Sequence, residues 1–150
     1  MTERINLGKA APELYEGLHE LHVRVAAVCR SAGIEDGFSH LLLTRASQIN
    51  RCAYCIRMHT RDALACGEST DRVNLLPAWR ETGYFNAKER ASLELLESIT
   101  LVAEDQVPDS VYQRAREVLS EKEVVAVAWL AVMINAWNRI AVTSRYAVDD

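Results

Sequence analysis

The sequence predicts an all-α fold, a single domain that spans residues 1–150 and forms a bundle of about seven helices. Apolar residues recur every three or four positions along most of the chain, and no segment alternates strictly between apolar and polar residues. The 6 Gly and 3 Pro residues are too few for an architecture of short strands and tight turns. A chain of 150 residues suits one domain of ordinary size.

Four helices are expected in the first half of the chain. Gly33 and Gly67 stand where the first and third helices end, because glycine readily adopts the backbone conformation that follows a helix. Ser69 or Thr70 can cap a short fourth helix, which Pro77 ends or kinks. The expected ranges are 12–31, 36–49, 52–66 and a short segment that reaches residue 76.

Three further helices are expected in the second half. Asn86 and Glu89 have the spacing of a capping box, and Ser120 and Glu123 repeat it before a long apolar segment. Pro108 precedes a shorter helix, since proline is common where a helix begins. The expected ranges are 89–104, 111–119 and a long helix that begins after residue 120.

The apolar run 124–134 in the last helix could be mistaken for a membrane span. Asn135, Asn138 and Arg139 interrupt it well before the ~20 apolar residues that a bilayer requires. The run is therefore interpreted as a core or subunit-interface helix, which favours an oligomer. Buried asparagines there would need hydrogen-bond partners between helices, across subunits or near the cysteines.

Composition and charge exclude several functions. The chain has 17 Lys and Arg against 21 Asp and Glu, so it carries no basic excess with which to bind nucleic acid. The first 17 residues lack the apolar stretch of a secretory signal, and we expect a cytoplasmic protein. Thiols stay reduced in the cytoplasm, so a close cysteine pair is more often catalytic, redox-active or metal-binding than a structural disulfide.

Cys52, Cys55 and His59 form the pattern that carries chemistry. At helical spacing the three side chains share one face, and residues three apart lie close enough for a disulfide. His59 can reach the Cys55 thiol directly or through a water and accept its proton, which makes Cys55 the expected nucleophile. Attack on a hydroperoxide would give a sulfenic acid that Cys52 resolves to a disulfide, which a reductant must reopen.

Three stretches together resemble the alkylhydroperoxidase D-like branch of the carboxymuconolactone decarboxylase superfamily. They are RASQINRCAYCIRMHTRDALACGES, PAWRETGYFNAKERASLELLE and NAWNR. The resemblance implies an all-α fold, obligate trimers or hexamers and thiol-dependent reduction of small alkyl hydroperoxides. It implies that Cys55 is the peroxidatic cysteine, Cys52 its disulfide partner and His59 part of a proton relay. It also implies a dithiol or lipoylated-protein reductant, and we expect no cofactor and no metal.

The chain departs from the pattern of that family at two positions. The family relay has a Glu twelve residues before the first cysteine, where this chain has His40. A histidine can carry protons near neutral pH, but its neutral form is not a carboxylate. The founding member also has a histidine just before the second cysteine, where this chain has Tyr54.

Other interpretations of these residues remain open. The motif could be two buried small side chains beside a satisfied histidine, or His40 could complete a Cys2His2 zinc site. Cys29 and Cys66 are expected to pack in the core, and His19 and His22 to lie on a solvated or interface face. Two other functions stay possible: a lyase that acts on a lactone, and a non-enzymatic oligomeric redox sensor.

Overall fold

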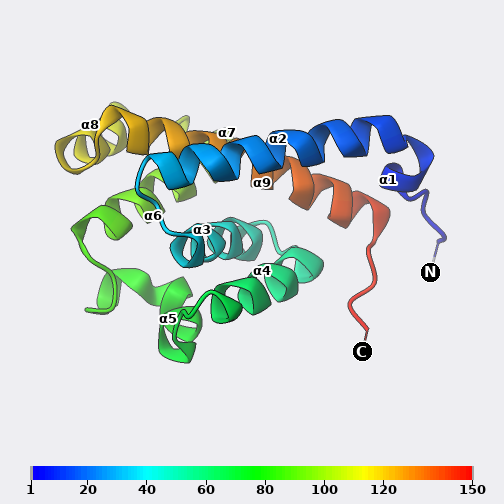
Figure 1. Cartoon of the computed structure of the whole chain (residues 1–150), viewed down its shortest axis with the longest axis horizontal. Coiled ribbons are helices and arrows are strands. Elements are labelled where there is room, and N and C mark those ends of the chain that lie inside the picture. The colour runs from blue at the N-terminus through cyan, green and yellow to red at the C-terminus, as the bar shows by residue number, and fades with distance from the viewer. Residues whose placement is uncertain (1, 150) are drawn as a thin grey trace.

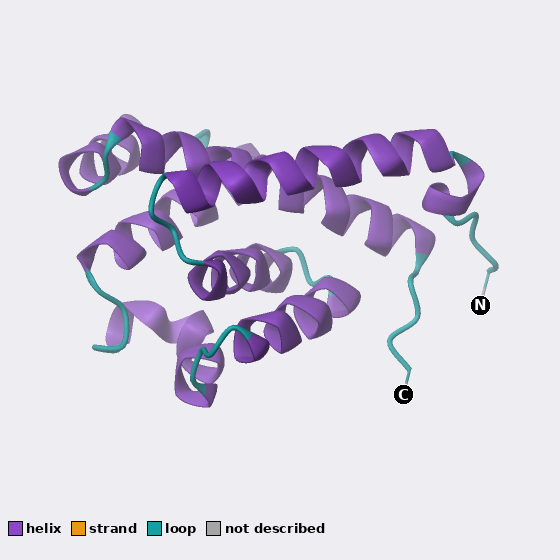
Figure 2. Cartoon of the chain, in the orientation of Figure 1, coloured by secondary structure: helices purple, strands orange, loops and turns teal. Residues whose placement is uncertain are grey.

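In the computed structural model, which describes residues 2–149, the chain is helical and contains no strand in that range (Figure 2). The all-α prediction is therefore confirmed, with more helices than the seven expected. The elements are α1 (Leu7–Ala10), α2 (Pro12–Ser31), α3 (Asp36–Ile49), α4 (Ala53–Ala65), α5 (Thr70–Leu75), the 3-10 helix η1 (Leu76–Glu81), α6 (Ala87–Thr100), α7 (Val102–Asp105), α8 (Asp109–Val118) and α9 (Glu121–Ser144).

The predicted capping residues act as expected. The side chains of Asn86 and Ser120 accept the backbone N–H of Glu89 and Glu123, and both glutamates bond back, so α6 and α9 begin with complete capping boxes. Ser69 caps α5 by accepting the backbone N–H of Arg72.

Several boundaries differ from the sequence predictions. Helix α4 begins at Ala53, because Cys52 is extended and serves as its N-cap. At Pro77 the structure agrees with the expectation of an end or a kink: the α-helix ends at Leu75, and the 3-10 helix η1 that follows has non-helical dihedrals at Ala78. The expected helix 89–104 is broken at Leu101, although apolar periodicity runs through the break.

Helix α9 is the central element of the core. It packs against α2, α3 and α6, and α2 lies alongside it in Figure 1. Its residues Val127, Met133 and Ile134 are fully buried. By length and composition α9 could cross a membrane, contrary to the expectation that it is too short. Half of its most apolar stretch is buried inside the protein, as in the core helix of a folded domain.

A buried carboxylate joins three elements beside this core. The Glu97 side chain accepts hydrogen bonds from Trp79 Nε1 at 2.8 Å and from Arg45 Nε and Arg80 Nη1 at 2.7 Å each. Burial alone would raise the pKa of Glu97, but these hydrogen bonds outweigh it and lower the pKa. Glu97 on α6 thereby holds η1 and α3 in place.

Substituting Glu97→Gln should lower the free energy of unfolding by about 2–3 kcal/mol, because the mostly buried Arg45 loses its counter-charge. The lowered pKa of Glu97 means that its stabilisation is present above the ordinary glutamate pKa and is lost as pH falls through the folded-state value. The difference between wild type and variant should therefore shrink in acid. Urea unfolding at neutral and acidic pH measures both effects.

The matched control is Glu94→Gln, which breaks the more exposed pair with Arg114. An exposed ion pair contributes little, so this variant should unfold like the wild type. Equal losses in the two variants would contradict a special role for Glu97.

Candidate active site

The turn between α3 and α4 places Cys52 at the start of α4. Arg51 has a positive φ of 55°, and the backbone N–H of Cys52 donates to the carbonyl oxygen of Ser47 at 2.9 Å. Cys52 Sγ then accepts the backbone N–H of Cys55 at 3.4 Å. Both cysteines are free thiols and only 2% exposed. The turn thus brings the two sulfurs to one helix N-terminus, where the helix dipole favours negative charge.

Asparagines from α9 and α3 support this turn. Asn138 donates to Ser47 Oγ at 3.0 Å, and its side-chain oxygen accepts the Asn50 amide at 2.9 Å. Asn50 also donates to Asn135 at 2.9 Å, and Asn135 donates to Thr100 at 3.2 Å. The buried asparagines therefore find partners on neighbouring helices of the same chain.

Asn138 also affects the thiols themselves. It is 1% exposed, and its side-chain hydrogen bonding lowers the pKa of both Cys52 and Cys55. The sequence left open whether Asn138 has its partners between helices, across subunits or near the cysteines. The signal available was a polar residue inside an otherwise apolar helix, a position that requires a hydrogen-bond partner.

The two thiols differ in pKa. The side-chain hydrogen bond with Cys55 lowers the pKa of Cys52 to about 7, and the Cys55 backbone N–H adds to this against the effect of burial. The same sulfur–sulfur hydrogen bond, together with burial, raises the pKa of Cys55. Cys52 therefore holds the first negative charge of the pair, with the Cys55 thiol as its hydrogen-bond donor.

His40 on α3 and His59 on α4 form a second pair of candidate residues. Their rings stack with centroids 5.7 Å apart, and His59 is only 2% exposed. Burial, followed by the neighbouring charges of His40 and His22, lowers the pKa of His59 to about 3. Neither ring nitrogen of His59 has a hydrogen-bond partner among the described residues, so no direct bond joins it to Cys55. Of the two expected routes, the one through water fits this geometry.

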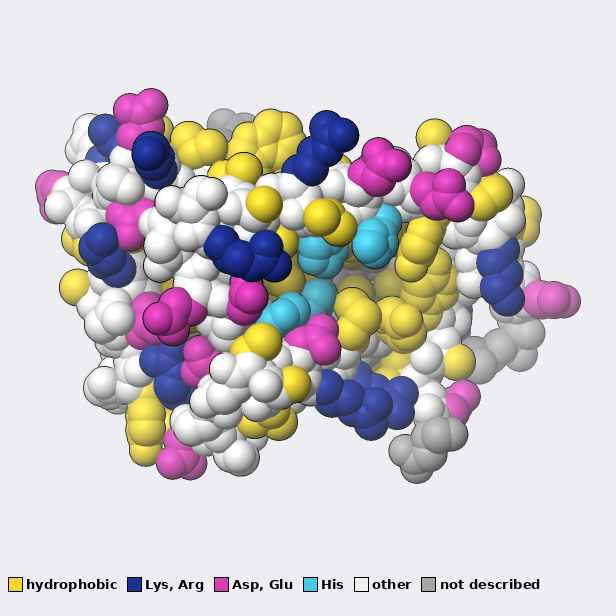
Figure 3. Space-filling view, viewed as in Figure 1, with side chains coloured by type: hydrophobic (Ala, Val, Ile, Leu, Met, Phe, Trp, Pro, Cys, Tyr) yellow, Lys and Arg dark blue, Asp and Glu magenta, His cyan; other side chains and the backbone are white. Residues whose placement is uncertain are grey.

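His22, which was expected with His19 on a solvated or interface face, lies near His40. Burial is the largest cause that lowers the pKa of His22, and nearby His40 and Asp62 also influence it. Figure 3 shows the histidine side chains gathered in one hollow of the surface. This grouping comes from the packing of α2 against α3 and cannot be read from spacing along the sequence.

The Cys2His2 zinc arrangement is not formed. Within residues 2–149, the candidate ligand group around His40 and His59 contains Asp62 and neither cysteine. The four predicted site residues thus form two adjacent pairs, one of thiols and one of imidazoles. Asp62 was missed because one aspartate on a charged helix face gives no sequence signal.

The two sulfurs face different cavities. Cys55 lines a cavity of about 170 Å³ together with His22, Met58 and Trp137. Cys52 lines one of about 590 Å³ whose wall includes Arg51 and Tyr146. Tyr54 and Tyr146, in edge-to-face contact at 5.1 Å, line both cavities.

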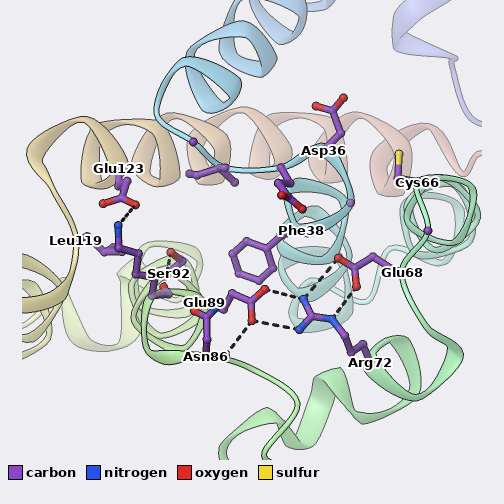
Figure 4. Close-up of a pocket in the computed structure, with 16 residues that line it drawn as sticks. Asp36, Phe38, Cys66, Glu68, Arg72, Asn86, Glu89, Ser92, Leu119 and Glu123 are labelled. Carbon is purple, nitrogen blue, oxygen red and sulfur yellow. Dashed lines mark hydrogen bonds and ion pairs between the residues drawn. The ribbon is translucent and has the colours of Figure 1, made fainter.

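A separate cavity of about 680 Å³ lies away from the thiol pair (Figure 4). Its central charge, Arg72, is already paired with Glu68 and Glu89 at 2.7 Å each. Cys66 lies at its edge and is exposed, so the expectation of core packing was wrong for this residue: it follows the last residue of α4 and faces outward. Cys29 is buried, as expected, and donates to the carbonyl oxygen of Ala126.

Comparison with known proteins finds similar chains. The chain is 37% identical over 142 residues to the uncharacterized protein YdfG of Bacillus subtilis (strain 168), which covers 95% of this chain and 94% of that protein. It superimposes with a TM-score of 0.89 and 36% identity on the crystal structure of ATU0492 from Agrobacterium tumefaciens, over 99% of both chains. ATU0492 is a protein of unknown function with a suggested role as the antioxidant defence protein AhpD.

Residues 12–98 match the carboxymuconolactone decarboxylase family, and this range includes both cysteines and both site histidines. The chain therefore belongs to the carboxymuconolactone decarboxylase family, in agreement with the resemblance found in its sequence.

Proposed function

We propose that the protein is a thiol-dependent peroxidase or disulfide reductase that reduces small alkyl hydroperoxides through Cys52 and Cys55. The observation that carries the proposal is the pair of free, hydrogen-bonded thiols at the N-terminus of α4. One of them, Cys52, has a pKa of about 7. The antioxidant role suggested for ATU0492 supports the same chemistry.

The hydroperoxide is reduced by two electrons, which the two sulfurs supply as they form a disulfide. The sulfur of Cys55 attacks the terminal peroxide oxygen, the O–O bond breaks, and the alcohol leaves with a proton. Cys52 is again a thiolate once its proton has passed to the leaving alcohol. It attacks the sulfenic sulfur, the S–O bond breaks, and the hydroxide leaves as water after taking a proton from solvent, as the disulfide forms. An external dithiol, free or carried as a lipoyl group on a protein, restores both thiols by disulfide exchange.

Cys55 must lose its proton before it attacks. The Cys52 thiolate is the nearest acceptor, because the two sulfurs share a hydrogen bond. His59, one helical turn after Cys55, is neutral and can accept the proton through a water. Its low pKa makes the protonated form short-lived, so the proton passes on to the stacked, more exposed His40.

We further propose that the protein works in the cytoplasm as a homo-oligomer, a trimer or a hexamer. Val125, Trp129 and Val132 project from one side of α9 and are 44–52% exposed in the single chain. Their spacing makes a continuous apolar stripe, and a second copy of the chain is the usual partner for such a surface.

The charge on Cys52 can be tested by titration in a Cys66→Ser background, which removes the exposed thiol. The Cys52 thiolate should form as pH rises through about 7. Cys55→Ala removes the side-chain donor and should raise that pKa toward the ordinary thiol value, whereas Cys55→Ser keeps a donor and should raise it less. Equal pKa values in the two variants would contradict the sulfur–sulfur hydrogen bond. Alkylation rate against pH measures them.

One equivalent of tert-butyl hydroperoxide should oxidise the wild type with a loss of two hydrogens in intact mass, mapped to Cys52 and Cys55. Cys52→Ser should stop at a sulfenic acid on Cys55 that dimedone traps, because no resolving thiolate remains. Cys55→Ser should form neither product. Cys66→Ser is the control and should behave like the wild type.

Three results would argue for other functions. Wild-type hydroperoxide consumption in the Cys52→Ser/Cys55→Ser double variant, with a dithiol donor, would refute the proposal. Lactone turnover by that variant would indicate a lyase. A single stoichiometric oxidation that changes the oligomer size, without turnover, would indicate a redox sensor.

Trp129→Glu places a charge on the apolar stripe and should shift the protein toward the monomer in size-exclusion chromatography with light scattering. Tyr112→Glu changes an aromatic residue of similar exposure on α8 and should leave the assembly intact. A monomeric wild type would refute the proposed assembly.

A further inference from the structure

Three potential metal ligands meet where α3 packs against α4. His40, His59 and Asp62 each offer one ligand atom, and these atoms lie within 4.8 Å of one another. Asp62 Oδ2 is 3.9 Å from Nδ1 of His40 and 3.9 Å from Nδ1 of His59. The carboxylate thus approaches both imidazoles on the sides that carry Nδ1.

The buried imidazole atoms of this group lack hydrogen-bond partners. Among the described residues, Nδ1 and Nε2 of His59 and Nδ1 of His40 are buried and unpartnered. Leaving a buried polar atom without a partner destabilises the fold, and such atoms are rare in folded proteins. His59 is 2% exposed, so its nitrogens have little access to bulk water. A bound ion would satisfy one nitrogen of each imidazole.

The chemistry of the three donors selects the kind of ion. Two imidazoles and one carboxylate suit divalent first-row transition metals such as Zn²⁺ or Fe²⁺ and leave coordination positions open. Ligation requires neutral imidazole, and burial of His59 favours that form.

The three donors must move closer together before an ion fits between them. Metal–ligand bonds of about 2.1 Å at tetrahedral angles place ligand atoms about 3.4 Å apart. Asp62 therefore needs to approach each imidazole by about half an ångström from its present 3.9 Å. The ligand nitrogens of His40 and His59, which lie within 4.8 Å of each other, must close by up to about 1.4 Å. Its side chain is 47% exposed and has room to move.

We propose that His40, His59 and Asp62 bind a divalent transition-metal ion. The binding does not rest on the proposed peroxidase function, since neither thiol is a ligand. It does affect that function: an ion on Nδ1 of His59 leaves Nε2 as an N–H donor, so the metal-bound imidazole can no longer accept a proton from Cys55.

The test is isothermal titration of the reduced full chain, free of any histidine tag, with Zn²⁺. The Cys52→Ser/Cys55→Ser variant should bind one ion per chain as well, because its thiols do not contribute. In that background His40→Gln and Asp62→Asn should each weaken Zn²⁺ binding at least about tenfold. Both residues are partly exposed, so these variants avoid the risk of replacing the buried His59.

His19→Gln is the matched control, since His19 is an exposed histidine of α2 outside the ligand group. It should bind Zn²⁺ like its parent. Unchanged affinity in both His40→Gln and Asp62→Asn would overturn the proposed site.

The absorption spectrum of the Co²⁺-loaded wild type distinguishes this site from the thiols. We expect the visible bands of nitrogen and oxygen coordination without a thiolate-to-cobalt charge-transfer band. A strong charge-transfer band that disappears in the double serine variant would place the ion on Cys52 and Cys55 and overturn the proposal. Neither outcome depends on peroxidase activity.

Discussion

The site depends on one constraint, the buried hydrogen bonds that fix the turn between α3 and α4 against α9. Asn138 is nearly inaccessible to solvent and satisfies Ser47 and Asn50 at once. If these buried polar groups lost their partners, the loss of folding free energy would exceed what the hydrogen bonds contribute when formed. The turn is therefore stable only in the position that keeps all of these hydrogen bonds. Because Cys52 is held by its backbone bond to Ser47, the position of the first thiol follows from that of the turn.

The fold was predictable from the sequence because its signals are local. Apolar periodicity, the capping pairs at Asn86 and Ser120, and the glycines at positions 33 and 67 each act within a few residues. The break at Leu101 escaped prediction, since the apolar pattern is the same on both sides of it. The extra short helices also carry no pattern long enough to detect.

The candidate site was predictable only where it is contiguous in sequence. Cys52, Cys55 and His59 lie within eight residues of one another, so helical geometry alone groups them. Asn138 comes from a helix 83 positions after Cys55, and His22 from the helix before the site, so both depend on tertiary packing. The order of the thiol pKa values likewise depends on the hydrogen bond between the two sulfurs, and to a smaller extent on the backbone N–H that Cys52 accepts as the N-cap of α4.

The two cavities on either side of the Tyr54–Tyr146 contact give the thiol pair two separate approaches. The cavity at Cys55 admits a molecule of a few heavy atoms, whereas the one at Cys52 is more than three times as large. In the proposed reaction, a bulky dithiol would therefore reach an oxidised pair at the Cys52 sulfur, with Cys55 as the leaving thiolate. Oxidant and reductant would then not compete for the same space, and a tightly bound alcohol product would not obstruct reduction.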